Sequence, residues 1–214
     1  MKRFIITTTS LFMALLVTAG SWYLLKFKPG NKSFVAINTK TEKGRAIAIE
    51  LFAKARKAKV FVHANGYNTS ICFLIDMQIE SGTNRFFVYD FEKDSILNAG
   101  LVTHGRCNEN WLIGRRYGNE VGCGCTSIGK YKIGKPYQGR FGLAYKLYGL
   151  DTTNSNAFKR FVVLHSHDCV PAQEVSPAPV CQSDGCPTVS VPFLQSLATI
   201  IDESKKPVLL WVFN

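Results

Sequence analysis

Apolar residues in the body of the chain follow a helical period at first and form short, strand-like runs afterwards. Residues 39–58 place Ile47, Leu51 and Ala55 on one face of a helix, because residues four positions apart share a side. Later, short apolar runs bounded by Gly, Pro, Ser and Asn predict β-strands. These strands are expected at residues 72–79, 86–91, 96–103, 127–133, 143–148, 161–164 and 208–213.

Turn and cap residues separate these elements. Residues 81–84, Ser-Gly-Thr-Asn, predict a hairpin between the first two strands, and residues 134–139 predict a later turn. Ser190 is a favourable helix N-cap and Pro192 suits the first turn, so a second helix is expected there, ending at residues 205–207. Its buried face contains Leu194, Leu197, Ile200 and Ile201.

The pattern as a whole favours a mainly β domain with a helix before it and a helix near its end. Residues 107–125 are rich in Gly and Cys and have no clear period, which is typical of a surface loop. We therefore expect a helical lead-in at residues 29–64 and a single β-rich domain at residues 65–214.

The N-terminal segment predicts export. Two basic residues precede an apolar run at residues 4–25, and Lys26 and Lys28 follow it. Residues 1–28 are therefore expected to be a signal peptide or a membrane anchor, because a bilayer span needs about 20 apolar residues. Val-Thr-Ala at residues 17–19 offers a cleavage site, so cleavage stays open. The inner membrane is a partner only if the segment is retained.

Charge narrows the choice of partner. The 26 Lys and Arg residues exceed the 15 Asp and Glu residues, which gives a formal net charge of +11. Such a surplus favours nucleic acid, acidic lipid or an anionic cell-wall polymer. Because the predicted export removes the protein from nucleic acid, we expect a wall polymer as partner and a periplasmic or cell-envelope location.

The seven cysteines fit an oxidising compartment. Three disulfides would leave one free thiol, and Cys186 is the candidate for it. Cys123 and Cys125 flank one glycine, so each is expected to pair with a distant partner. A zinc site is the alternative for these thiols, but no Cys-x-x-Cys pair is present, and we expect neither a metal nor a cofactor.

Cys186 and His165 are the candidate catalytic residues. Cys186 lies in the sequence Ser-Asp-Gly-Cys-Pro at residues 183–187, and His165 ends an apolar run upstream. An imidazole that accepts the proton of a thiol turns the thiol into a nucleophile. The glycine before the cysteine lets a substrate carbonyl approach the backbone. The structural alternative for Cys186 is a disulfide with Cys181 or Cys169.

The order of these motifs resembles the L,D-transpeptidase catalytic domain family, over about residues 65–214. In that family a histidine precedes a Ser-x-Gly-Cys sequence, and the separation between His165 and Ser183 falls within its range. Residues 126–131, Thr-Ser-Ile-Gly-Lys-Tyr, resemble the family's glycine-containing strand before the active site. One branch, the murein L,D-transpeptidase-like proteins, is similar at residues 73–77, 85–90 and 103–105 and at Pro187.

The resemblance implies acyl transfer on peptidoglycan stem peptides by a mainly β, mixed-sheet catalytic domain. Cys186 would attack the carbonyl of the third stem residue and release the terminal D-Ala. An amine of a neighbouring stem, or water, would then accept the acyl group. His165 would act as general base and acid, and the backbone N–H groups of Gly185 and Cys186 would form the oxyanion hole.

The resemblance also implies roles around this pair. A backbone carbonyl or a hydroxyl often holds the family's base, and Ser166, His167 or Asp168 would supply it here. Arg106 and Arg140 are the nearest candidates to bind a substrate carboxylate. Further pocket and motif residues of the predicted site are Ser183, Tyr131 and His104.

Three positions depart from the family's pattern. Ser166 follows the histidine where many members have glycine, Asp184 stands where His or Arg is common, and Pro187-Thr188 replaces a substrate-binding arginine. A carboxylate at Asp184 would raise the pKa of a nearby thiol. These departures indicate a slow enzyme, a different acceptor or a bias towards hydrolysis, as in an L,D-carboxypeptidase.

Two other function classes stay open. His165, His167 and Asp168, together with His104, offer ligands for zinc in a metal-dependent peptidase or amidase. A non-catalytic wall-binding protein on the same fold would use only the positive charge. A papain-like protease is disfavoured, because in such proteases the cysteine precedes the histidine.

Overall fold

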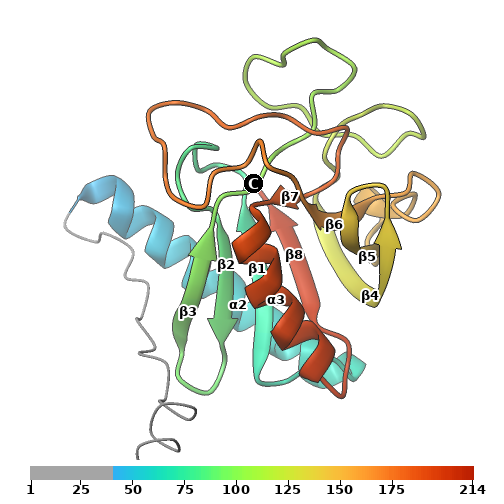
Figure 1. The fold of residues 1–214 in the computed structure, drawn as a ribbon. Coiled ribbons are helices and arrows are strands. Elements are labelled where there is room, and N and C mark those ends of the chain that lie inside the picture. The colour runs from blue at the N-terminus through green and yellow to red at the C-terminus, as the bar shows by residue number, and fades with distance from the viewer. Residues whose placement is uncertain (1–40) are drawn as a thin grey trace, which may run out of the picture. The chain divides into compact units, whose positions relative to one another are not determined.

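The computed structural model describes residues 41–214, and the predicted signal or anchor segment at residues 1–28 lies outside them. In the described part of the chain, no helix has the length and apolar character needed to cross a membrane. The same residues form an eight-stranded sheet with one long helix on each face (Figure 1). The prediction of a mainly β domain with two flanking helices is confirmed.

The sheet is mixed, with the strand order β3-β2-β1-β8-β4-β5-β6-β7. The pairs β1–β8 and β6–β7 are parallel, and the other neighbours are antiparallel. The strands are β1 (Ile71–Asp76), β2 (Phe86–Asp90), β3 (Ser95–Gly100), β4 (Gly129–Gly139), β5 (Gly142–Gly149), β6 (Val163–Ser166), β7 (Thr188–Val189) and β8 (Leu209–Phe213). The predicted hairpin of the first two strands is present as β1–β2.

Alternation along the strands divides the core into two apolar faces. Successive side chains of a strand point to opposite faces, so Cys72 of β1 lies on one face and Phe73 on the other. The first face packs against α2 (Glu42–Asn65), and the second packs against α3 (Val191–Glu203). Each helix therefore covers one apolar layer of the sheet.

The ends of both helices follow local cap chemistry. Ser190 caps α3 as predicted, since its hydroxyl accepts a hydrogen bond from the Phe193 N–H at 3.4 Å. Helix α2 extends beyond the predicted range of residues 39–58. It continues to Gly66, which provides the left-handed cap with a φ of 73°.

The β4–β5 hairpin differs from the prediction. Residues 134–139, which were expected to form a turn, belong to β4, and the chain reverses at residues 140–141 instead. A register irregularity between Ile133 and Pro136 accommodates the proline, which has no N–H for the ladder. The hairpin is therefore longer than its glycine and proline content indicates.

The strand that carries His165 is displaced from its predicted position. β6 begins at Val163 rather than at residue 161, because Phe161 has a φ of 56° and cannot continue a strand. His165 therefore lies inside β6, where it pairs with Thr188 of the two-residue strand β7. The sequence did not reveal β7.

The chain has two disulfides, Cys107–Cys125 and Cys169–Cys181, and three free cysteines, Cys72, Cys123 and Cys186. The expectation of three disulfides is therefore wrong. Cys72 is fully buried under α2 in a core cluster that contains no second cysteine. Cys123 has no disulfide partner, and its Sγ accepts the N–H of Cys125 at 3.4 Å. The disulfide alternative for Cys186 is also wrong.

Long connections gather with the C-terminus at one end of the sheet (Figure 1). Isolated bridges join these connections, including Gly105 to Ser183 and Val102 to Val189. The segment after β3 therefore lies directly beside the segment that contains Cys186.

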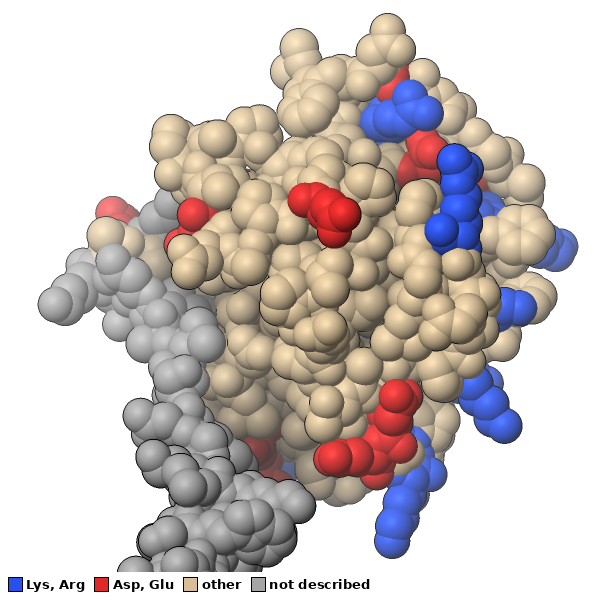
Figure 2. Space-filling view, in the orientation of Figure 1, with Lys and Arg blue, Asp and Glu red and all other residues tan. Residues whose placement is uncertain are grey.

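Basic side chains are concentrated on one side of the face that Figure 2 shows. Figure 2 shows lysines and arginines mainly over the β4–β5 side of the visible face. A groove of about 850 Å³ lies between β4, β5 and the end of α3, and Asp202 is the one acidic residue among the described residues that line it. Its basic lining residues are Lys132, Lys135, Lys146, Lys205 and Lys206.

Candidate active site around Cys186

The predicted nucleophile and base line one pocket. Cys186 lies just before β7 and His165 lies on β6, so the parallel pairing of these two strands brings both residues together. The pocket has a volume of about 260 Å³, and Thr103 and Phe141 also line it. It is large enough for part of a peptide chain.

The Ser-x-Gly-Cys turn is fixed by hydrogen bonds from both sides. The Ser183 N–H donates to the His104 carbonyl at 2.9 Å, and the Arg106 N–H donates to the Ser183 carbonyl at 2.8 Å. Inside the turn, the Ser183 hydroxyl accepts the Gly185 N–H at 3.2 Å and donates to the Cys186 carbonyl at 2.7 Å. The serine of the motif therefore sets the position of the cysteine.

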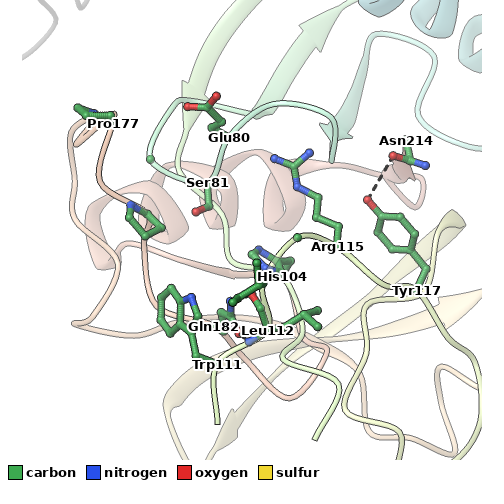
Figure 3. Close-up of a pocket in the computed structure, with 14 residues that line it drawn as sticks. Glu80, Ser81, His104, Trp111, Leu112, Arg115, Tyr117, Pro177, Gln182 and Asn214 are labelled. Carbon is green, nitrogen blue, oxygen red and sulfur yellow. Dashed lines mark hydrogen bonds between the residues drawn. The ribbon is translucent and has the colours of Figure 1, made fainter. Parts of the chain in front are cut away.

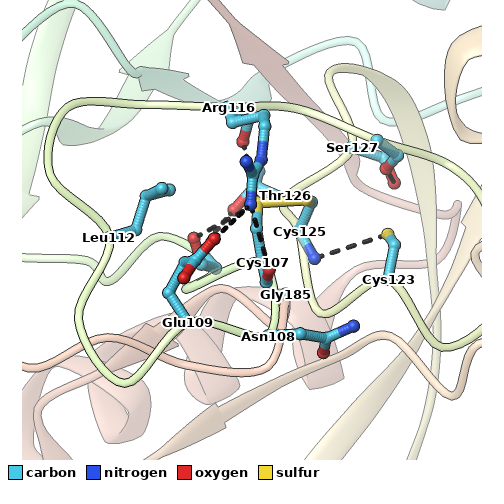
Figure 4. The surroundings of a disulfide bond; sticks show 12 residues. Cys107, Asn108, Glu109, Leu112, Arg116, Cys123, Cys125, Thr126, Ser127 and Gly185 are labelled. Atoms are coloured by element: carbon cyan, nitrogen blue, oxygen red, sulfur yellow. Dashed lines mark hydrogen bonds and ion pairs between the residues drawn. A yellow bond between two sulfur atoms is a disulfide. The ribbon is translucent and has the colours of Figure 1, made fainter.

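Gly185 adopts a backbone conformation that other residues rarely take, with a φ of 103°. A Cβ atom at this position would lie 2.5 Å from the carbonyl oxygen of Cys125. Cys125 is held by its disulfide to Cys107 beside the turn (Figure 4). The glycine is therefore required for the 107–125 loop to pack against the catalytic turn.

The backbone N–H of Cys186 is one of the two predicted oxyanion-hole donors. It donates to no acceptor within residues 41–214. The N–H of Gly185, by contrast, donates to the Ser183 hydroxyl. Of the two predicted oxyanion-hole donors, Cys186 is therefore the one that is available in this conformation.

The thiol of Cys186 lies against the backbone that leads into β6. Its Sγ accepts the Val163 N–H at 3.4 Å and lies 3.8 Å from the Phe161 carbonyl oxygen, to which it donates. Burial raises the pKa of the thiol, the Val163 N–H and the Arg160 guanidinium lower it, and Asp184 raises it further. The net effect keeps the thiol protonated at neutral pH.

His165 is held in one tautomer. Its Nδ1 lies 3.0 Å from the Ser166 carbonyl oxygen, which can only accept, so Nδ1 carries the proton. Nε2 is therefore an acceptor, and it lies 3.1 Å from the hydroxyl of Thr188. The Phe141 ring stacks on the imidazole at 4.8 Å between centroids. Burial lowers the pKa of His165, the Ser166 carbonyl raises it, and His167 lowers it further.

These shifts favour a neutral thiol and a neutral imidazole over an ion pair. A raised thiol pKa and a lowered imidazole pKa both oppose proton transfer before substrate binds. Within residues 41–214 the two side chains form no hydrogen bond with each other, and the Thr188 hydroxyl contacts Nε2 instead. General-base catalysis by His165 would require the thiol to turn from the Phe161 carbonyl towards Nε2.

Arg160 is a candidate functional residue that its sequence context did not reveal. Its guanidinium donates to the Gly118 carbonyl at 2.9 Å, and also to the Cys125 carbonyl and the Ser127 hydroxyl. Its charge lowers the pKa of the Cys186 thiol. Arg160 belongs to no local motif, and its basic character just before a predicted strand was the one available signal.

Three further predicted residues line the pocket of Cys186, namely Arg106, His167 and Ser183. Arg106 forms an ion pair with Asp184, with 2.7 Å between Nε and Oδ1. Nδ1 of His167 accepts the N–H of Cys169 at 3.1 Å. The basic group predicted to bind a substrate carboxylate is therefore at the pocket, but it already has an acidic partner.

The remaining predicted residues lie elsewhere. Asp168 and Arg140 are exposed and do not line this pocket. Tyr131 is buried in the core, and its hydroxyl donates to the Ser127 carbonyl at 2.6 Å. His104 lines a separate pocket. The backbone carbonyl of Ser166 contacts Nδ1 of His165. Ser166 was one of three residues expected to hold the base, the others being His167 and Asp168.

The described domain therefore combines a buried histidine on a sheet strand with a free thiol in a Ser-x-Gly-Cys turn. The model of the L,D-transpeptidase catalytic domain family matches residues 43–213, and the chain belongs to this family. The family resemblance recognised in the motifs is confirmed. No three His, Cys, Asp or Glu side chains of the described residues converge as metal ligands.

Solved structures give a more distant likeness. The L,D-transpeptidase from Mycobacterium smegmatis is 14% identical to this chain. The aligned region covers 68% of this chain and 59% of that protein, with a TM-score of 0.40. The L,D-transpeptidase from Xylanimonas cellulosilytica is 11% identical, with coverages of 71% and 67% and a TM-score of 0.37. The helical cell shape determining protein Pgp2 from Campylobacter jejuni is 11% identical, with coverages of 67% and 47% and a TM-score of 0.39.

The chain thus spans 59% of the length of the first of these structures. A comparison with curated protein sequences found no significant match.

Proposed function

We propose that this protein is an exported cysteine acyltransferase that acts on peptidoglycan stem peptides, as an L,D-transpeptidase or an L,D-carboxypeptidase. One observation carries the proposal: Cys186 and His165, whose Nε2 is an acceptor, line one pocket, and the Cys186 N–H has no acceptor among residues 41–214. Membership of the L,D-transpeptidase catalytic domain family supplies the substrate class. The two disulfides support export.

In the first half-reaction, Sγ of Cys186 attacks the carbonyl carbon of the third stem residue while its proton moves to Nε2 of His165. The resulting oxyanion accepts the Cys186 N–H. The imidazolium then gives the proton to the nitrogen of the terminal D-Ala as the C–N bond breaks. The products are free D-Ala and a thioester on Cys186.

In the second half-reaction, an amine of a neighbouring stem or a water molecule attacks the thioester. His165 takes a proton from the attacking group and returns it to Sγ as the C–S bond breaks. An amine gives a cross-link between stems, and water gives a shortened stem that ends in a carboxylate. Cys186 is a neutral thiol again in either case.

Arg106 is the proposed contact for a substrate carboxylate. Its ion pair with Asp184 lies at the pocket rim, with the two side chains 40% and 71% exposed. Exposed ion pairs contribute little to stability, so an incoming carboxylate can displace Asp184 from Arg106. The lysine-lined groove beside β4 and β5 offers a further surface for an anionic wall polymer.

Acylation by a carbapenem tests the proposal, because its strained lactam carbonyl acylates a nucleophilic thiol without needing an acceptor. After incubation under mild reduction, intact-mass measurement should show one added carbapenem per wild-type chain. Cys186→Ala should show none. His165→Ala should form the adduct at least about a hundredfold more slowly, because a general base typically contributes that much or more.

Cys123→Ala is the matched control, since Cys123 is the other partly exposed free thiol. It should form the adduct at the wild-type rate. A mass gain that survives Cys186→Ala, or no gain on the wild-type protein, would contradict the proposal. The second outcome, combined with binding to isolated cell walls, would favour the non-catalytic wall-binding protein.

A further inference from the structure

A second and larger pocket shares the lining residue Gln182 with the pocket of Cys186. It has a volume of about 610 Å³, and its lining includes Glu80, His104, Trp111 and Arg115 (Figure 3). Gln182 lines both pockets and exchanges two hydrogen bonds of 2.8 Å with the backbone of Leu112. The two pockets are therefore neighbours with a shared wall.

His104, which lines this pocket, has a buried ring nitrogen without a hydrogen-bond partner among the described residues. Its side chain is 8% exposed, and its Nδ1 lies 3.3 Å from Nη2 of Arg85. A guanidinium only donates, so Nδ1 accepts and Nε2 carries the proton. Among residues 41–214, Nε2 is buried and has no hydrogen-bond partner. A buried unsatisfied donor is costly, which points to an acceptor that a ligand supplies.

Two arginines add positive charge at the same place. Arg85 is fully buried, and Arg85 Nη1 and Arg115 Nη2 donate to the same Ile79 carbonyl oxygen, at 3.1 and 2.7 Å. None of the ion pairs within residues 41–214 includes either arginine. Burial and then the charge of Arg115 lower the pKa of Arg85 to about 9, and Asp76 acts in the opposite direction.

Burial and the neighbouring charges together fix the protonation state of His104. Burial, then Arg85 and Arg115, lower the pKa of His104 to about 4. At neutral pH the ring is therefore an uncharged donor next to two guanidinium groups. A buried positive region with a spare donor is suited to a small anion.

We propose that this pocket binds the terminal carboxylate of a peptide, with Arg115 and the His104 Nε2–H as donors and with Trp111 against the adjoining carbon atoms. Trp111 is 50% exposed at the pocket and provides an apolar surface. Glu80 also lines the pocket, so a singly charged carboxylate suits its charge better than a phosphate. None of these residues takes part in the acyl transfer proposed above, so the assignment does not depend on the thiol chemistry.

A peptide bound in this pocket lies next to the catalytic turn. The His104 carbonyl accepts the N–H of Ser183, the first residue of that turn, at 2.9 Å. The pocket is therefore placed to hold a second peptide, or a distant part of the same one, beside Cys186.

Calorimetric titration of the full-length Cys186→Ala protein tests the assignment without turnover. The probes are N-acetyl-D-alanyl-D-alanine, its C-terminal amide and inorganic phosphate. The acid should bind at least about tenfold more tightly than the amide, since a hydrogen bond to a charged acceptor is stronger than one to a neutral acceptor. Phosphate should bind more weakly than the acid. Equal affinity for the acid and the amide overturns the proposal, and tighter binding of phosphate assigns the pocket to another anion.

Arg115→Gln and Arg116→Gln form a matched pair in the same background. Arg116 is the next residue in the chain, but it pairs with Glu109 and does not line the pocket. Arg115→Gln should weaken binding of the acid about tenfold or more, and Arg116→Gln should change it less than about twofold. Equal losses in the two variants would contradict the proposal.

Nitrogen-15 NMR of the Cys186→Ala protein locates the peptide independently of any substitution in the pocket. Binding of the acid should shift the Nε2–H signal of His104 and leave the Nδ1–H signal of His165 nearly unchanged. A shift confined to His165 would place the peptide in the Cys186 pocket and exclude the second site.

Discussion

Two buried histidines, His165 and His104, show how the partner of one ring nitrogen decides the role of the other. The side chains are 5% and 8% exposed, and burial lowers the pKa of both. Nδ1 of His165 faces a carbonyl, so its Nε2 accepts. Nδ1 of His104 faces a guanidinium, so its Nε2 donates. A neutral imidazole is therefore suited to act as a base in one pocket and as a hydrogen-bond donor to an anion in the other.

The contrast arises from the fold rather than from burial. The backbone of β6 places the Ser166 carbonyl against its neighbour His165. The β1–β2 hairpin, in contrast, carries a buried arginine, Arg85, to His104. Substitutions that remove one ring, or one contact of a ring, test whether these roles are separate.

The largest effect is expected from His165→Gln. Glutamine keeps a polar side chain of similar reach but cannot take the thiol proton, so carbapenem adduct formation should slow by about a thousandfold. His104→Gln should slow it by less than about tenfold, because His104 touches the catalytic turn only through its backbone. Time-resolved intact-mass measurement gives both rates.

His63→Gln is the control for this comparison, because His63 lies in the last turn of α2 and is exposed. Its adduct rate should equal that of the wild-type protein. If His165→Gln and His104→Gln slow adduct formation equally, the two histidines do not have the separate roles of base and hydrogen-bond donor.

The next largest effect concerns stability in acid. The folded-state pKa of His104 is about 4, below its ordinary value of 6.5. The unfolded chain therefore binds the proton first, so stability falls as the pH drops from about 6.5 to about 4. Complete loss of this contribution corresponds to about 3 kcal/mol. Urea denaturation at several pH values measures the fall.

His104→Gln should flatten that part of the pH profile. Asp76 also titrates abnormally, since burial raises the pKa of its carboxyl, so the difference between wild type and His104→Gln is the quantity to compare. A difference that does not change with pH would show that His104 is not held neutral by its surroundings.

The part of the candidate site that short sequence motifs define was predictable. The Ser-x-Gly-Cys turn and His165 are recognisable by residue type and order, and β6–β7 pairing brings them to one pocket. Thr188 and Arg160 were missed because their importance lies in contacts that no spacing reveals. Thr188 reaches His165 only through the two-residue strand β7, which is too short to leave a pattern.

The fold was likewise predictable where alternation is regular. The strands β1, β2 and β8 match apolar runs, because both faces of the sheet are covered by helices. Gly and Pro content misled the prediction in β4, where strand pairing overrides local turn preference. Arg85 was unexpected as well, since arginine is rarely buried and its partners come from distant residues such as Val102.

The smallest effect is expected at Thr188, the residue that contacts the base. Its hydroxyl lies 3.1 Å from Nε2 of His165, and the side chain is 3% exposed. Thr188→Val keeps the volume but removes the donor that occupies Nε2, so adduct formation should become faster, by up to about tenfold, because this hydrogen bond must break before Nε2 accepts the thiol proton. The pH at which the rate reaches half its maximum should also move. Thr188→Ser keeps the hydroxyl and should restore both the rate and the profile. If the Thr188→Val and Thr188→Ser variants have the same rate and pH profile, Thr188 is only a packing residue. The tautomer of His165 then depends on the Ser166 carbonyl alone.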